Sequence, residues 1–90
     1  MPEIDELRKT IAEIDGEIIR KIGERCKIAE QIGALKIAEG LAITAPAVEA
    51  AVVERFVREG TARGLSGEFC RKLARLVIDE AVLHQEKLRE

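Results

Sequence analysis

The sequence contains almost no aromatic residues: Trp and Tyr are absent, and Phe56 and Phe69 are the only two phenylalanines. Proteins that bind nucleic acids usually present a basic face, and those that bind single strands also stack bases on aromatic side chains. Here the formal net charge is -2, and acidic and basic residues are interspersed along the chain. We therefore expect no nucleic-acid partner.

Cysteine and histidine, which commonly bind transition metals or carry redox chemistry, are equally scarce. The two cysteines, Cys26 and Cys70, lie far apart without a spacing typical of metal ligands, and His84 is the only histidine. Both cysteines are expected to be reduced, half-buried thiols. A single histidine also argues against a histidine-based metal site or catalytic dyad. The sequence thus predicts no metal and no cofactor.

Long apolar runs are missing as well, because no segment approaches the length of a membrane span. The beginning of the chain, MPEIDELRK, is acidic and amphipathic, unlike a signal peptide. We therefore expect no membrane partner and a cytoplasmic location. With 90 residues, of which 47% are hydrophobic and 36% charged, residues 1–90 are expected to form one small domain. Domains of this size are often completed by oligomerisation.

Helical periodicity is the strongest signal that the sequence does contain. Apolar residues recur every three or four positions from Ile4 to Leu35, and Gly40 follows as a stop. This pattern predicts a helix from about residue 3 to about residue 39, roughly 55 Å long at 1.5 Å per residue. Such a helix exceeds the width of any globule that this chain could form alone. It therefore needs a partner along its face, either the later helices or a second copy of the protein.

Two breaks, GLAITAPAVEA at residues 40–50 and RGLSG at residues 63–67, separate two further helices. Pro46 suits the first turn of a helix that runs to about residue 63, with Ala45 at the N-cap unless Thr44 caps it one residue earlier. Ser66 is a good N-cap for a third helix from about residue 67 to the end. No strand pattern is present, so the expected fold is all-α with a very long first helix. The residues expected to face inward are Val48, Val52, Val53, Phe56, Val57, Phe69, Leu73, Leu76, Val77, Val82 and Leu83, with Gln85 beyond them.

Two cations, Arg25 and Lys36, fall on the apolar stripe of the first helix. Separately, each has a structural explanation, since an arginine can extend to solvent or pair with a carboxylate and a lysine can complement a helix C-terminus. Together they lie eleven residues apart, nearly a whole number of turns, and so point the same way about 16 Å apart. Two like charges directed at one volume repel unless an anion fills it. This arrangement suits a small dicarboxylate ligand.

Arg8 also borders the apolar stripe, but it lies seventeen residues from Arg25, about 25 Å along a straight helix. It cannot reach the same ligand within its own chain. In an antiparallel dimer of the long helix, the corresponding arginine of the partner could. Both the helix length and Arg8 therefore favour a two-fold homodimer with shared sites.

The order and spacing of these residues resemble the all-helical class of chorismate mutases. The resemblance covers residues 7–36, LRKTIAEIDGEIIRKIGERCKIAEQIGALK, and residues 76–88, LVIDEAVLHQEKL, which are similar to the closing helix of that family with its glutamine. It implies an intertwined homodimer of three-helix chains that rearranges chorismate to prephenate, on the route to phenylalanine and tyrosine. The matching positions are Leu7, Arg8, Ile11, Asp15, Glu24, Arg25, Ala29, Gly33, Lys36 and Gln85.

The resemblance also implies a role for each site residue. The partner's Arg8 and the chain's own Arg25 would bind the two substrate carboxylates. Lys36 would contact a carboxylate and the ether oxygen, Gln85 would donate to that oxygen, and Glu49 would hold the ring hydroxyl. Arg25, Lys36 and Gln85 would thus be catalytic. The reaction is pericyclic, so it requires no covalent intermediate, and fixed cationic donors can stabilise the charge that develops on the ether oxygen.

The sequence departs from the family pattern at three positions. Ala45 and Val48 stand where an Asp and an Arg are common, and Ala81 stands where a Ser is frequent. These changes leave two alternatives open: an isochorismate pyruvate lyase of the same fold, and a non-catalytic helical dimer or regulatory partner. Glu49 could also be an ordinary first-turn carboxylate, and Gln85 a solvated polar residue.

Overall fold

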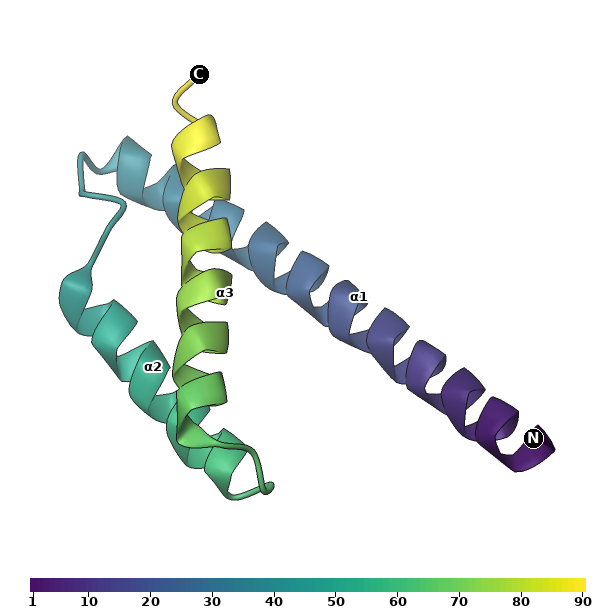
Figure 1. Cartoon of the computed structure of the whole chain (residues 1–90). Coiled ribbons are helices and arrows are strands. Elements are labelled where there is room, and N and C mark those ends of the chain that lie inside the picture. Colours follow the sequence, from purple (N-terminus) through teal and green to yellow (C-terminus); the bar gives the residue numbers. More distant parts are fainter.

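The computed structural model describes residues 1–90 and contains three α-helices and no strand. The helices are α1 (Pro2–Ala38), α2 (Pro46–Thr61) and α3 (Gly67–Lys87), as Figure 1 shows. The predicted all-α fold with a very long first helix is therefore confirmed. The predicted helix boundaries are correct to within one residue for α1 and two residues for the end of α2. Helix α3 begins at the predicted residue but ends at Lys87, three residues before the predicted end.

The helix ends follow the local sequence. After α1, Gly40 adopts a positive φ of 71°, and the N–H of Leu41 donates to the carbonyl of Lys36 at 2.8 Å. Helix α2 begins after Ala45, which offers no side-chain acceptor. No side-chain hydrogen bond caps this helix, so Thr44 does not supply a cap one residue earlier. At the start of α3, Ser66 Oγ accepts a hydrogen bond from the N–H of Phe69 at 3.1 Å, as expected.

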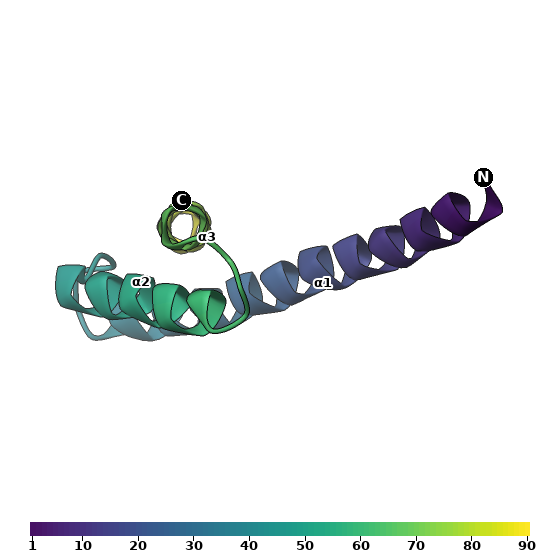
Figure 2. The same cartoon turned by 60° about the horizontal axis from the view of Figure 1, so that its bottom comes forward.

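Helix α3 is the centre of the fold. It packs against both α1 and α2, whereas α1 and α2 do not pack against each other. Figure 2 shows α3 end-on, raised above the other two helices. Its buried positions include small residues, Cys70, Ala74 and Ala81, which allow the helices to approach closely. Helix α2 approaches α3 closely at Gly60, where any β-carbon would overlap the Sγ atom of Cys70.

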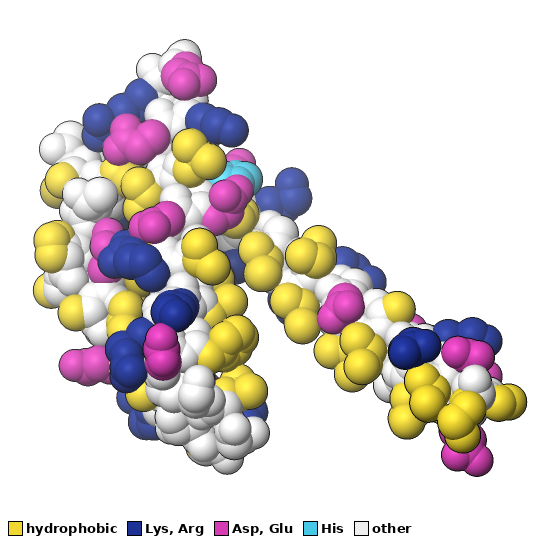
Figure 3. All heavy atoms as spheres, in the orientation of Figure 1, with side chains coloured by type: hydrophobic (Ala, Val, Ile, Leu, Met, Phe, Trp, Pro, Cys, Tyr) yellow, Lys and Arg dark blue, Asp and Glu magenta, His cyan; other side chains and the backbone are white.

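The first half of α1 projects away from the other helices (Figure 1). Almost every residue from 2 to 20 is exposed, including apolar ones such as Leu7 at 66% and Ile11 at 58%. Figure 3 shows hydrophobic side chains along this projecting half. Only 12 of the 90 residues are buried, and no large side chain is fully enclosed. The chain alone therefore leaves much of its apolar surface uncovered.

Several side chains that were expected to face inward are exposed in the single chain, namely Val48, Phe69, Leu76 and Leu83. Val77 and Gln85 are buried on α3 as expected, and the rest of its buried face consists of Cys70, Ala74, Ile78 and Ala81. Three of these four are small residues, which permit close helix contact. Both cysteines are free, as predicted, but they are buried rather than half-buried. No helix combines the length and the hydrophobicity that crossing a bilayer requires.

Candidate active site

One pocket, of about 270 Å³, is walled by all three helices and by the connection between α1 and α2. Ten of its fourteen lining residues are hydrophobic. The four others are Arg25, Lys36, Glu49 and Gln85, so the structure brings four of the five predicted site residues into one apolar cavity. In such surroundings, each charge or hydrogen-bond donor acts more strongly than it would in water.

Gln85 is the buried polar residue of the site, with only 7% of its surface exposed. Its Nε2 atom donates a hydrogen bond of 2.8 Å to the carbonyl oxygen of Ala29 on α1. The side chain passes directly over Gly33, where a β-carbon would lie 2.8 Å from Cγ of Gln85. One N–H therefore fixes the amide, and the second N–H remains to bind a ligand.

Lys36 links the end of α1 to the loop that follows it. Its Nζ atom donates a hydrogen bond of 2.9 Å to the carbonyl oxygen of Ile43, a residue of the same pocket wall. An ammonium group has three N–H donors, so two remain for a ligand. The loop carbonyl thus holds the charge of Lys36 at the pocket without neutralising it.

Arg25 lines the pocket from α1 and forms no ion pair with any carboxylate of the chain. It is half-buried, so solvent compensates its charge only in part. A guanidinium in this position is free to form a bidentate contact with a carboxylate ligand. The pocket therefore offers two cations, Arg25 and Lys36, with no carboxylate bound to either.

Glu49 reaches the pocket from the first turn of α2, where it also pairs with Arg75 of α3. The Arg75 guanidinium donates to a Glu49 carboxylate oxygen at 2.8 Å and to Asp79 at 3.0 Å. The hydrogen bond with Glu49 is the main reason why the pKa of Arg75 is raised above its ordinary value. Sequence reasoning missed Arg75, because only its pairing with Asp79 four residues later has a sequence signal.

Arg8 does not line the pocket; it lies in the exposed half of α1, where no other part of the chain covers the helix. The single chain therefore does not bring Arg8 to the other four predicted residues.

The three positions that depart from the family pattern are all in the pocket wall. Ala45, Val48 and Ala81 line the same cavity as the four polar residues. Because all three are apolar, they add no hydrogen-bond donor, acceptor or charge to the wall. The polar chemistry of the pocket is thus confined to its two cations, one carboxylate and one amide.

Comparison with known proteins gives three matches. A family model described as chorismate mutase type II matches residues 7–86. A bifunctional chorismate mutase/prephenate dehydratase of Aquifex aeolicus is 43% identical over 58 residues, which are 64% of this chain and 16% of that protein. An intracellular chorismate mutase of Mycolicibacterium smegmatis is 37% identical over 57 residues, 63% of this chain and 55% of that protein. The matched part is thus less than two thirds of either relative.

Proposed function

Because the chain belongs to the chorismate mutase type II family, we propose that it rearranges chorismate to prephenate in the biosynthesis of phenylalanine and tyrosine. One observation carries the proposal. The polar residues of the pocket wall, Arg25, Lys36, Glu49 and Gln85, are the four that the family resemblance implies within one chain. The names of both relatives agree with this activity, and the word intracellular in one name supports a reaction inside the cell.

Arg25 and Lys36, the two cations of the pocket that have no carboxylate partner, bind the substrate. Arg25 binds one carboxylate of chorismate through its planar fork, and Lys36 contacts a carboxylate as a compact point charge. Two anchored carboxylates select the compact conformer in which the reacting carbons lie close together. Selecting this conformer removes part of the entropic barrier of an intramolecular reaction.

Catalysis uses the two donors that converge on the ether oxygen, Lys36 and Gln85. As the C–O bond breaks, negative charge builds on this oxygen before the new C–C bond is complete. The free N–H of Gln85 and an N–H of Lys36 stabilise that charge more in the transition state than in the bound substrate. The bonds to Ala29 and Ile43 hold both donors in place before the reaction begins.

Glu49 accepts a hydrogen bond from the ring hydroxyl of the substrate. Its partner Arg75 contacts one carboxylate oxygen and leaves the second carboxylate oxygen available for the hydroxyl. The arginine common at the position of Val48 is absent, so Arg75 is the guanidinium that contacts Glu49 in this chain.

The fifth residue, Arg8, completes the site from a second chain in an intertwined two-fold homodimer. Support for the dimer comes from the exposed apolar residues along the projecting half of α1. An antiparallel partner helix would cover them and would carry its own Arg8 toward the first chain's pocket. Each dimer then contains two equivalent sites, and each site uses residues from both chains.

A second reaction, the cleavage of isochorismate to salicylate and pyruvate, is favoured by one feature of the pocket. Ala45 and Val48 remove polar groups from the wall near Glu49, the region that holds the ring hydroxyl in the proposed mutase. With fewer polar groups near the ring hydroxyl, the pocket discriminates less between chorismate and isochorismate, which carry that hydroxyl at different ring positions.

The deciding experiment incubates the purified protein with chorismate or isochorismate and identifies the products by chromatography. We expect prephenate from chorismate, whereas salicylate and pyruvate from isochorismate would identify the lyase. Arg25→Ala should abolish turnover, and Arg71→Ala, which changes an exposed arginine of α3 outside the pocket, should not. If neither substrate is consumed, the proposal fails and the non-catalytic alternative is favoured.

A further inference from the structure

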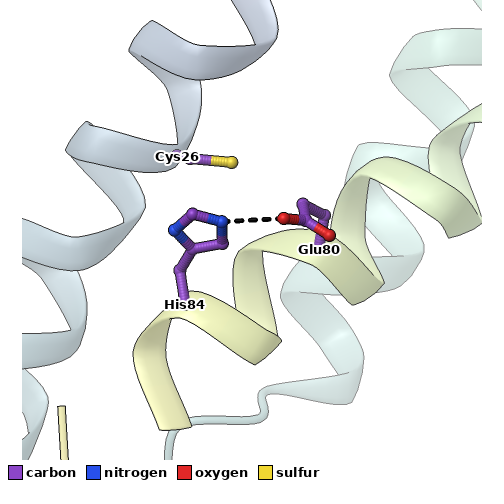
Figure 4. A group of neighbouring side chains, drawn as sticks. All are labelled: Cys26, Glu80 and His84. Atoms are coloured by element: carbon purple, nitrogen blue, oxygen red, sulfur yellow. Dashed lines mark hydrogen bonds and ion pairs between the residues drawn. The ribbon is translucent and has the colours of Figure 1, made fainter. Parts of the chain in front are cut away.

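A second group of reactive side chains lies where α1 packs against α3. It consists of Cys26 on α1 and of Glu80 and His84 on α3 (Figure 4). One donor atom of each residue lies within 4.8 Å of the others. Glu80 and His84 are four residues apart, so they share one face of α3, and that face meets α1 at Cys26. None of the three lines the candidate active site.

His84 is already oriented for ligation by a fourth residue. Its Nδ1 atom lies 3.0 Å from an oxygen of Glu30, one turn beyond Cys26 on α1. Its Nε2 atom faces the other way and lies 2.7 Å from an oxygen of Glu80. In metal sites, a ligating histidine typically donates its second ring N–H to a carboxylate, which fixes the tautomer. Glu30 is placed to do this, and it leaves Nε2 on the side of Cys26 and Glu80.

We propose that Cys26, Glu80 and His84 form a binding site for a divalent transition-metal ion, with Zn²⁺ the best match, and that Glu30 orients the imidazole from outside. A thiolate, an imidazole and a carboxylate are the three donor types that zinc binds in proteins. Three protein ligands leave a fourth tetrahedral position for water. This donor set differs from the oxygen-only environments that Mg²⁺ and Ca²⁺ prefer.

The distances require only a small adjustment. Zinc lies about 2.3 Å from sulfur and about 2.0–2.2 Å from nitrogen and oxygen, so tetrahedral donors are about 3.6 Å apart. The Glu80 oxygen, now 2.7 Å from Nε2 of His84, must move away from it by somewhat under about 1 Å, and the Glu80 side chain, which is 49% exposed, can rotate to do so. Cys26 is buried and fixed by the packing of α1 on α3, and His84 is fixed by Glu30. Two of the three ligands, Cys26 and His84, are thus already held in place, and the third, Glu80, can adjust.

Binding exchanges protons for the metal ion. The Cys26 thiol loses its proton to solvent and binds as the thiolate, and Nε2 of His84 binds through its lone pair. If His84 begins as the imidazolium, Nε2 releases a second proton. The thiolate and the Glu80 carboxylate together balance the charge of a divalent ion. The bound ion joins α1 to α3 beside Arg25 and Gln85, which are the sequence neighbours of Cys26 and His84.

The simplest alternative is that the cluster is only an ion-paired histidine. In that case His84 bridges Glu30 and Glu80, and the Cys26 thiol takes no part. The two explanations differ in whether sulfur binds the ion, which a cobalt spectrum reports directly. Tetrahedral cobalt with a thiolate ligand shows a sulfur-to-metal charge-transfer absorption, and a site of histidine and carboxylate alone does not.

The test titrates the full chain, stripped of metal with a chelator and kept reduced, with Co²⁺ and then with Zn²⁺. We expect one ion per chain, the charge-transfer absorption, and a melting temperature that rises with Zn²⁺. Cys26→Ser should abolish the absorption, and His84→Gln and Glu80→Gln should each weaken binding at least about tenfold. The two α3 changes lie on side chains that are partly exposed, so the fold survives them.

Matched controls are available on the same helix. Glu68→Gln alters an exposed carboxylate of α3 outside the cluster, and Cys70→Ser removes the other thiol. Both should retain the cobalt spectrum of the unchanged protein. A spectrum without thiolate absorption, or His84→Gln and Glu80→Gln proteins that bind Zn²⁺ as tightly as the unchanged chain, would overturn the proposal. Because the readout is metal binding, the result is independent of chorismate turnover.

Discussion

At the scale of the residue, the position of Gln85 depends on a glycine of the facing helix. Gly33 leaves the space that the Gln85 side chain crosses on its way to the Ala29 carbonyl. The sequence pattern placed both Gly33 and Gln85 in the family motif but could not show that they touch, because they lie 52 positions apart in different helices. The contact between Arg75 and Glu49 was unpredictable for the same reason.

Gly33→Ala should lower turnover by about 10- to 100-fold, because the new β-carbon displaces Gln85 from its position. We expect a small loss of stability, since overpacking costs about 1–3 kcal/mol while helix propensity returns about 1 kcal/mol. Gly23→Ala is the control: no atom lies within 4 Å of its added β-carbon, so it should stabilise the protein by about 0.5–1 kcal/mol with unchanged turnover. Equal kinetics for the two variants would show that Gly33 does not position Gln85.

Lys36→Ala and Gln85→Ala should each lower the turnover number more than they weaken substrate binding. Both side chains donate to the ether oxygen in the proposed mechanism, where the charge is largest in the transition state. Steady-state kinetics with chorismate separate the two effects. A change confined to the Michaelis constant would assign these residues to substrate binding alone.

His84 should make stability depend on pH when no metal ion is present. Hydrogen bonds with Glu30 and then Glu80 raise the pKa of His84 above its ordinary value of 6.5, and the thiol of Cys26 lies beside them. The protonated ring therefore stabilises the folded state. This contribution is fully present below pH 6.5 and is lost as the pH rises through the higher pKa of the folded protein.

The measurement compares melting temperatures of the unchanged protein and His84→Gln, in chelator, from about pH 5.5 to about pH 9. The advantage of the unchanged protein should shrink as the pH rises. A constant difference across this range would mean that His84 has the same pKa in the folded and unfolded chains.

At the scale of the element, the sequence predicted where the helices begin and end better than it predicted which face each one buries. Gly40, Pro46 and Ser66 act within one turn of their own position, so local chemistry determines the boundaries. The buried face depends on what packs against it. Leu76, expected inward, is 68% exposed, because Ala74 and Ile78 instead occupy the contacts of α3.

Ala45→Asp should stabilise the protein by about 1 kcal/mol, because α2 begins at a residue with no side-chain acceptor for its free N–H groups. Ser66→Ala, which removes the existing cap of α3, should destabilise it by about the same amount. Chemical denaturation measures both. If Ala45→Asp leaves the free energy of unfolding unchanged, the start of α2 does not limit stability.

At the scale of the whole molecule, the separation of Arg8 from the pocket is the feature that most needs explanation. The length of α1 could be predicted from its periodicity, and the projecting half in the structure agrees with that length. Contacts within the chain do not show what covers this half, because most of residues 2–20 are exposed in the single chain. The proposed dimer accounts for Arg8 and for the exposed apolar side chains together.

Mixed dimers test the shared site. Arg8→Ala and Arg25→Ala should each be nearly inactive, because every site in either homodimer lacks one arginine. If equal amounts are unfolded and refolded together, half of the dimers are mixed, and each mixed dimer has one intact site. About a quarter of all sites, and hence roughly a quarter of the activity, should return. Mixed dimers without recovered activity would place Arg8 outside the partner's site.

The projecting half of α1 also makes folding depend on the chain concentration. Most of the stability of a helix in a protein comes from the packing of its apolar face, and the projecting half of α1 has no such packing within its own chain. In the proposed dimer, the encounter of two chains therefore completes α1. Folding is then bimolecular, and its equilibrium follows mass action. In dilute solution the amount of assembled protein grows with the square of the chain concentration. Where the chain concentration lies well below the dissociation constant of the dimer, doubling it would therefore raise the activity about fourfold.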